Sequence, residues 1–221
     1  MKVLSHRGLW TQPQEKNTDA AFVASFNAGY GTETDVRDCA GRLVISHDMP
    51  RGDETSLDDF LDLLRRRRLP LAMNIKADGL ARAVADAMQR HGVADWFVFD
   101  MSIPDMREHL KVGNPVFARV SEVERQPPWL DRASGIWLDA FQGDWFSGAD
   151  VADLLRSGKR VCVVSPELHR REPLALWQAL RRLAGTPGLM LCTDRPDDAS
   201  AFFAAEPAAS RAVDACLQPA F

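Results

Sequence analysis

Eight short apolar runs, rich in β-forming residues, constrain the fold of this chain more than any other feature. Most are nearly continuous in hydrophobicity, as expected of strands that are buried on both faces. They lie at residues 3–4, 32–36, 71–75, 96–99, 115–120, 135–140, 160–164 and 189–193. Their alternation with about eight crossover segments predicts an α/β fold, a (β/α)8 TIM barrel that forms a single domain over residues 1–221. A doubly wound open sheet is the alternative.

Several of the connecting segments carry helical patterns. Ser56 is a predicted helix cap, and Gly29 marks the end of the first predicted helix. The connector 121–133 contains two adjacent prolines, so its helix is expected to be short or absent. The arginine run 65–68 is expected to be a solvated helix end. The predicted helices lie within residues 18–28, 56–68, 79–91 and 171–184.

The overall charge balance argues against a polyanionic partner. The 221 residues carry a formal net charge of −4, with 46% hydrophobic and 26% charged residues. This composition is compatible with an enzyme or a binding protein, but it does not favour nucleic acid as a partner. No apolar stretch reaches the roughly 18 residues of a membrane span, and no signal pattern opens the chain. The four cysteines lack metal spacing, which predicts a reducing, cytoplasmic setting without disulfides. The sequence leaves the oligomeric state open.

Polar or charged residues follow almost every predicted strand. In a TIM barrel the carboxyl ends of the strands build the active site. Charged groups are costly to bury without partners, so their gathering at one end favours a ligand or metal over ion pairs that merely close the barrel. These residues are His6, Arg7, Glu33, Asp35, His47, Asp48, Asn74, Lys76, Asp100, Arg119, Asp139, Ser165, Glu167, His169, Thr193 and Asp194.

Two carboxylates in the second predicted strand indicate a divalent cation. Glu33 and Asp35 are two residues apart, so in a regular strand they point to the same side. Adjacent carboxylates repel unless a cation lies between them. Oxygen ligands suit Mg²⁺ or Ca²⁺, which is the cofactor predicted here.

Four further residues suit the chemistry of a phosphate ester. His6 and His47 are the candidate catalytic acid and base, because histidine exchanges protons near neutral pH. Arg7 and Lys76 are the candidate phosphate-binding residues. Together with a cation these groups favour phosphoryl transfer, in which positioning and charge neutralisation do most of the catalysis.

The order of these motifs resembles the glycerophosphodiester phosphodiesterase family. The chain reads HRG at 6–8, NTDAAFVASFNAGYGTETDV at 17–36, GRLVISHD at 41–48, NIK at 74–76 and CTDRP at 192–196. The family pattern is HRG, ENT followed by AF and a glycine, ExDV, a hairpin ending in HD, a strand with ExK and a final TDxP. Each piece is weak alone, but their order and spacing together are specific and extend over nearly the whole chain.

The resemblance implies a TIM barrel of the phosphatidylinositol-phospholipase-C-like kind and a small phosphodiester substrate from lipid metabolism. It implies a divalent cation held by Glu33 and Asp35, with His6 and His47 as the acid–base pair. Arg7 and Lys76 would bind the phosphate. In the family, a neighbouring hydroxyl of the substrate attacks phosphorus, and water then opens the resulting cyclic phosphate.

The first departure from the family pattern concerns the metal. The acidic residue expected two positions before the lysine is Asn74 in this chain. An amide oxygen can coordinate a hard cation but adds no charge, so we expect weaker metal binding. Glu167 or Asp139, from other strand ends, is the candidate for the missing carboxylate.

The second departure concerns the loop after His47 and Asp48, which is short where family members often carry an insertion that shapes the glycerol pocket. This predicts a more open site, whose alcohol need not be glycerol. Lys16 is also inserted within the ENT element. Two alternatives stay open: a metal-independent lyase that stops at the cyclic phosphate, and a non-catalytic barrel that binds phosphodiesters.

Overall fold

The computed structural model describes residues 1–64 and 67–205 and contains all eight predicted strands. They run parallel in the order β5–β4–β2–β1–β9–β8–β7–β6. β5 and β6 meet through one bridge, Val98 to Val116, which brings the sheet close to a complete barrel. This confirms the TIM-barrel prediction over the open sheet. The bounds are β1 (Lys2–His6), β2 (Gly31–Cys39), β4 (Leu71–Ile75), β5 (Trp96–Phe99), β6 (Phe117–Val120), β7 (Gly135–Leu138), β8 (Arg160–Val164) and β9 (Leu189–Thr193).

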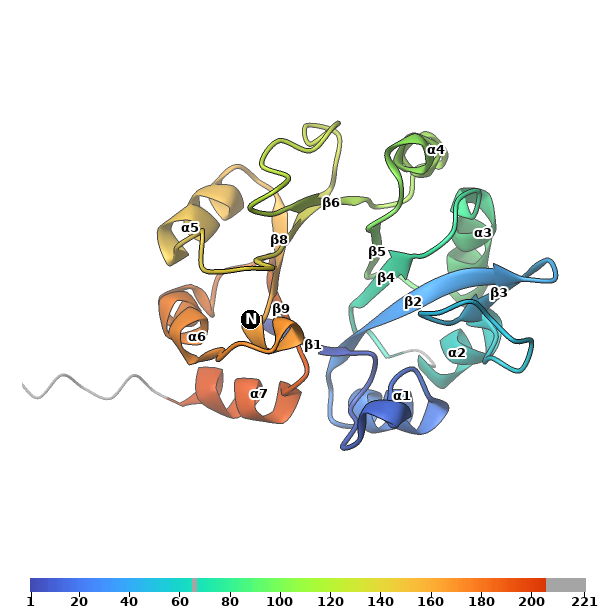
Figure 1. Ribbon diagram of the computed structural model, residues 1–221, viewed down its shortest axis with the longest axis horizontal. Helices are drawn as coiled ribbons and strands as arrows, with labels where there is room; N and C mark the ends of the chain where they lie inside the picture. The colour runs from blue at the N-terminus through green and yellow to red at the C-terminus, as the bar shows by residue number, and fades with distance from the viewer. Residues whose placement is uncertain (65–66, 206–221) are drawn as a thin grey trace, which may run out of the picture.

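Helices surround the strands, as Figure 1 shows. The four predicted helices are present, each shorter than its sequence pattern, and Ser56 caps α2 by accepting a hydrogen bond from the Asp59 amide at 3.1 Å. No helix forms in the connector 121–133, as predicted. Arg65 and Arg66 lie outside the described residues. The helices are α1 (Asp19–Asn27), α2 (Leu57–Leu64), α3 (Ala81–His91), α4 (Ile103–Val112), α5 (Gly148–Arg156), α6 (Leu174–Leu180) and α7 (Pro196–Ala204).

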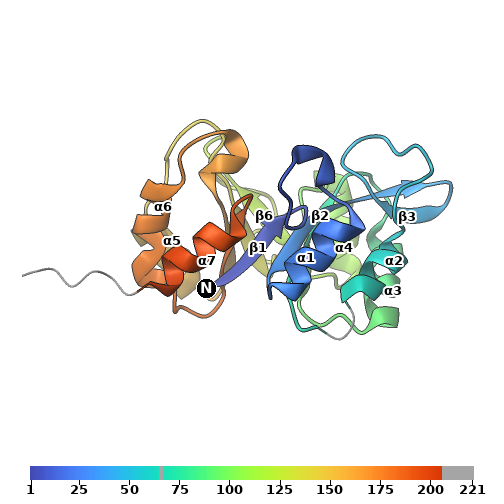
Figure 2. The ribbon, with the colours of Figure 1, turned by 90° about the horizontal axis from the view of Figure 1, so that it is seen from below.

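Among the described residues, one short strand and three 3-10 turns lie outside the ring of parallel strands and helices. β3 (Arg42–Ile45) pairs antiparallel with the second half of β2 and forms the predicted hairpin. The 3-10 turns are η1 (Pro13–Glu15), η2 (Pro166–His169) and η3 (Arg181–Leu183). Figure 2 shows that the η1 segment and the loop after β3 project on one side of the barrel, whereas the N-terminus lies on the other.

Apolar side chains form three buried clusters. Two lie between the strands and the surrounding helices, and the third fills the barrel interior. In the interior, Phe97 stacks on Phe117 with ring centroids 3.7 Å apart, and Phe99 stacks on Trp137 at 3.8 Å. Because this packing fills the lumen, charged side chains of the strands can gather only at its ends.

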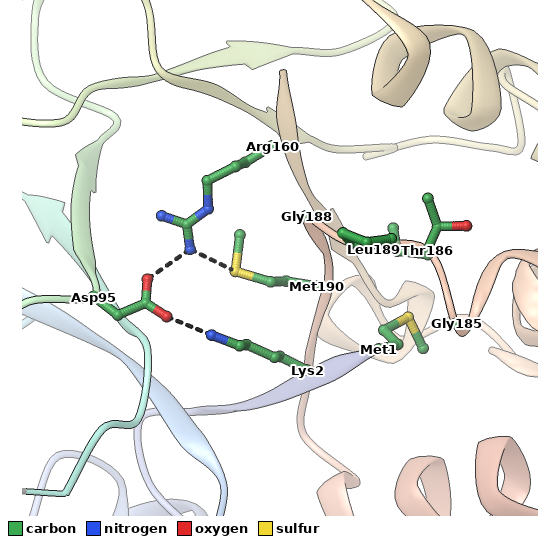
Figure 3. Close-up of a pocket in the computed structure, with 10 residues that line it drawn as sticks. Met1, Lys2, Asp95, Arg160, Gly185, Thr186, Gly188, Leu189 and Met190 are labelled. Carbon is green, nitrogen blue, oxygen red and sulfur yellow. Dashed lines mark hydrogen bonds and ion pairs between the residues drawn. The ribbon is translucent and has the colours of Figure 1, made fainter. Parts of the chain in front are cut away.

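The amino-terminal end of the barrel is held by a separate ion-pair cluster. Asp95 accepts from Lys2 at 2.6 Å and from Arg160 at 2.7 Å, beside a cavity of about 370 Å³ (Figure 3). The single carboxylate thus pairs with both cations. We interpret this cluster as structural, since it lies at the end of the barrel opposite to the candidate catalytic residues.

Two further expectations concern membrane-spanning helices and the cysteines. No helix within residues 1–64 and 67–205 is long and apolar enough to cross a membrane. Cys39, Cys162 and Cys192 are free thiols. Cys216 lies outside the described residues.

Candidate active site

His6 lies at the carboxyl end of β1 with one ring nitrogen fixed by a carboxylate. Its Nδ1 is 2.6 Å from Asp194 Oδ1, and its Nε2 is 3.8 Å from Glu33 Oε2. A carboxylate accepts a hydrogen bond, so Nδ1 carries the proton and Nε2 presents its lone pair toward Glu33. Burial lowers the pKa of His6, and Asp194 only partly opposes this effect. The imidazole is therefore neutral near pH 7 and is suited to accept a proton.

The Arg7–Gly8 turn directs a guanidinium into the same site. Arg7 has a φ of 63° and its amide donates to the Glu33 carbonyl at 2.9 Å. Gly8 has a φ of 90°, and a Cβ on it would lie 2.7 Å from the Cβ of Ala21. Only glycine fits this backbone and this close approach. As a result, Arg7 Nε reaches 2.8 Å from Asp35 Oδ2.

Glu33 and Asp35 are buried together on the interior face of β2, as predicted. Only 2% of Glu33 and none of Asp35 is exposed. Burial, and then the charge of Asp35, raise the pKa of Glu33 well above its ordinary value. Asn17 Nδ2 donates to Asp35 Oδ2 at 2.9 Å, and Lys76 Nζ lies 3.4 Å from Asp35 Oδ1. Arg7 and Lys76 therefore both approach Asp35.

Asn74 stands beside this pair on the neighbouring strand β4. It is in register with Asp35, and its Nδ2 donates to Asp100 Oδ2 at 3.3 Å. Burial raises the pKa of Asp100, which also pairs with Arg119 Nη1 at 3.0 Å.

Glu33 Oε2, Asp35 Oδ1 and Asn74 Oδ1, on the adjacent strands β2 and β4, are buried and make no hydrogen bond within the described residues, although Lys76 Nζ lies 3.4 Å from Asp35 Oδ1. Buried polar atoms without a hydrogen bond are rare in proteins and call for an explanation. No group of three His, Cys, Asp or Glu side chains with metal-binding geometry occurs in the described part of the chain. The third oxygen is an amide oxygen, and two carboxylates with one amide suit a hard divalent cation.

His47 belongs to the same side of the barrel but is far more exposed. Its side chain is 48% exposed, and its Nδ1 lies 2.8 Å from Asp48 Oδ1. It lines a surface cavity of about 470 Å³ together with Arg7, Lys16 and Asn17. The structure thus places Arg7 between the buried carboxylates and the cavity that holds His47.

Both carboxylates proposed from the sequence to replace the missing ligand have protein donors. Glu167 accepts from Ser165 Oγ at 2.5 Å, from the Asp194 amide at 3.1 Å and from Thr193 Oγ1. Asp139 accepts from His169 Nε2 at 2.7 Å and from the Ala140 amide at 2.8 Å. Neither has an oxygen among the buried atoms that lack a hydrogen bond.

Two roles could not be predicted from the sequence. Asp194 fixes His6, and Asp100 contacts Asn74. Both residues follow strands and were recognised as strand-end groups, but each pairing depends on which strands are neighbours. The pairing of β9 with β1 brings together His6 and Asp194, which are 188 residues apart in the sequence, and no local pattern reveals this pairing.

Comparisons with known proteins support the fold. No protein-family model and no curated protein matches the sequence. The chain is similar to a solved glycerophosphodiester phosphodiesterase from Agrobacterium tumefaciens, with 21% identity, coverage of 91% of this chain and 98% of that one, and a TM-score of 0.67. It is also similar to an Oleispira antarctica phosphodiesterase solved with the product sn-glycerol-3-phosphate, with 15% identity, 93% and 97% coverage and a TM-score of 0.67.

More distant barrels match as well. A phosphoribosyl anthranilate isomerase from Thermus thermophilus shares 17% identity over 92% of this chain and 97% of its own, with a TM-score of 0.50. At such identities similarity in structure shows the fold, which many enzymes with different activities share. The expected resemblance to glycerophosphodiester phosphodiesterases is confirmed at this level, and the activity must be argued from the site.

Proposed function

We propose that this protein is a divalent-metal-assisted phosphodiester hydrolase that acts on a glycerophosphodiester or a related small phosphodiester. The observation that carries the proposal is the arrangement around Glu33. His6 Nε2 lies 3.8 Å from Glu33 Oε2, and this oxygen, Asp35 Oδ1 and Asn74 Oδ1 are buried without hydrogen bonds on adjacent strands. The two phosphodiesterases of similar fold point to the same class of reaction.

The phosphate would be bound by Arg7 and Lys76. Both side chains are only about one-fifth exposed, and both approach Asp35, at 2.8 and 3.4 Å respectively. Their positive charges offset the repulsion between the buried carboxylates and the phosphate. A cation held by Glu33, Asp35 and Asn74 would neutralise charge that develops on the phosphoryl oxygens.

Proton transfer would involve the two histidines. His6 Nε2 takes the proton of a substrate hydroxyl, whose oxygen bonds to phosphorus as the bond to the leaving alcohol breaks. His47 gives a proton to that alcohol oxygen, leaving a cyclic phosphate. In the second step the roles reverse, and water adds to phosphorus and opens the ring. We assign the base to His6 because its pKa is lowered by burial, which keeps it neutral.

A substrate-panel assay tests the proposal. The protein is freed of metal with EDTA and assayed for alcohol and phosphate-monoester release with no metal, with Mg²⁺ and with Ca²⁺. We expect metal-dependent turnover that is lost in His6→Ala and His47→Ala. His91→Ala is the matched control, since His91 pairs with Asp58 on the helical surface.

Each alternative predicts a different result. Turnover that survives EDTA and accumulates cyclic phosphate would indicate the lyase. Binding of phosphodiesters without turnover, unchanged in both histidine variants, would indicate the non-catalytic barrel. Either result would refute the hydrolase.

We also propose that the alcohol pocket is open. The loop after Asp48 is short, and His47 and Asp48 line the surface cavity of about 470 Å³. Bulkier phosphodiesters should therefore be hydrolysed at least as well as glycerophosphocholine. A strong preference for the glycerol compound would contradict this.

A further inference from the structure

Asn74 occupies a position between two carboxylates on opposite sides. β4 lies between β2 and β5 in the sheet. Across one side Asn74 is in register with Asp35, and across the other it is in register with Phe99, which Asp100 follows directly. Asn74 therefore has Asp35 beside it on one neighbouring strand, and Asp100 follows the end of the other.

The hydrogen bond to Asp100 determines which end faces which strand. Asn74 Nδ2 donates to Asp100 Oδ2 at 3.3 Å. An ionised carboxylate only accepts, so the amide must turn its NH₂ toward Asp100. The carbonyl oxygen is then directed away from Asp100; it is buried and makes no hydrogen bond within the described residues.

Asp100 is itself held in place. Its Oδ1 pairs with Arg119 Nη1 at 3.0 Å, and Arg119 Nε pairs with Glu124 at 3.1 Å. Its backbone has a φ of 63°, in the left-handed region that aspartate and asparagine adopt more readily than most other residues. With one oxygen on Arg119 and the other on Asn74, Asp100 is placed to orient the amide.

We propose that Asp100 is a positioning residue that locks the Asn74 carbonyl oxygen toward Glu33 and Asp35, and so completes an oxygen site for a divalent cation. This deepens the proposed function and rests on it for the cation. The chain thereby compensates for the missing third carboxylate with an oriented amide, since hydrogen bonds from surrounding residues commonly orient metal ligands.

A double-mutant cycle read by calorimetry tests this, with Ca²⁺ or Mg²⁺ titrated into the metal-free full chain. In Asp100→Asn, the side-chain oxygen stays on Arg119 and the new NH₂ faces Asn74. The Asn74 amide must then flip and present its NH₂ to the cation. We expect cation affinity to fall about 10- to 100-fold, the usual effect of losing such an orienting partner.

The same substitution should behave differently when residue 74 is a carboxylate. In Asn74→Asp the two oxygens are equivalent, so no flip is available, and the amide introduced at position 100 of the double variant can donate to one of them. Asp100→Asn should then not weaken binding in the Asn74→Asp background. Asp144→Asn, at an exposed surface ion pair with Arg171, is the matched control and should leave affinity unchanged.

Three outcomes would overturn the proposal. These are wild-type affinity in Asp100→Asn, an equal loss in both backgrounds, and no cation binding by the wild type. Asp100→Asn is expected to fold, because asparagine tolerates the left-handed backbone of position 100 better than most residues. If it does not fold, Asp100→Ala gives a second test, because alanine has no oxygen to accept the hydrogen bond from Asn74. Cation binding is measured without substrate, so a failure of phosphodiester turnover would be seen separately.

Discussion

Replacing Glu33 with glutamine should stabilise the metal-free protein while removing its activity. Glu33 is 2% exposed, and burial together with the charge of Asp35 raises its pKa well above the ordinary value. At neutral pH the folded state therefore holds Glu33 in an unfavourable environment. Glutamine has nearly the same shape and carries no charge, so Glu33→Gln removes this cost.

The size of the effect follows from the strand geometry. Two residue rises separate the Cα atoms of Glu33 and Asp35 by about 6.6 Å. Taken as the separation of the charges, this distance corresponds to about 2.5 kcal/mol of repulsion at an effective dielectric constant of about 20. Arg7 and Lys76 attract Glu33 and offset part of this repulsion. We expect Glu33→Gln to raise the free energy of unfolding by about 1–2 kcal/mol in EDTA near pH 7.5.

Urea denaturation at several pH values provides the assay. Below the ordinary pKa of 4.5, Glu33 is protonated in both the folded and the unfolded states, so the wild type and the variant should be equally stable. As pH rises above 4.5 the unfolded state loses this proton at a lower pH than the folded state does, so the wild type is progressively destabilised relative to the variant until Glu33 is ionised in both states. Added Ca²⁺ or Mg²⁺ should stabilise the wild type more and narrow or reverse the difference.

Glu172→Gln, at an exposed glutamate, is the control and should change stability by less than about 0.5 kcal/mol. A Glu33→Gln protein that is less stable than the wild type in EDTA at pH 7.5 would refute the reasoning. So would a stability difference that does not depend on pH.

Three further predictions concern single positions. Asp194 raises the pKa of His6 and fixes its tautomer, so Asp194→Asn should lower kcat about 100-fold or more. It should also move the acid limb of the kcat/KM profile to lower pH than in the wild type, and an unmoved limb would contradict this. His47→Ala should abolish turnover yet change urea stability by less than about 0.5 kcal/mol, because the side chain is 48% exposed; a large stability loss would contradict it. Gly8→Ala should cost about 1–3 kcal/mol of unfolding free energy, because its Cβ would meet Ala21; urea denaturation that matches the wild type would show that the turn is not constrained.

The positions of the strands, and the residues of the candidate site that follow them, could be predicted from local sequence alone. Strands buried on both faces leave continuous apolar runs such as 71–75 and 160–164, and both are strands as predicted. The pair Glu33 and Asp35 was predictable because the two-residue period of a strand places both on one face. The helices are less predictable. The sequence pattern does not identify α4, α5 and α7, because their apolar patterns are short and tertiary packing stabilises them.

Which strand ends become partners depends on the folded barrel and could not be predicted from local sequence. Glu167 and Asp139 follow strands just as Asp100 does, and nothing local distinguishes the three. The order β5–β4–β2 brings Asp100 to Asn74, whereas Glu167 and Asp139 meet donors from their own part of the barrel. Likewise, the neighbours β9 and β1 bring Asp194 to His6. The local sequence gives the type of each side chain. The pairing of charges depends on which strands are neighbours, and the long-range packing of the whole barrel sets that order.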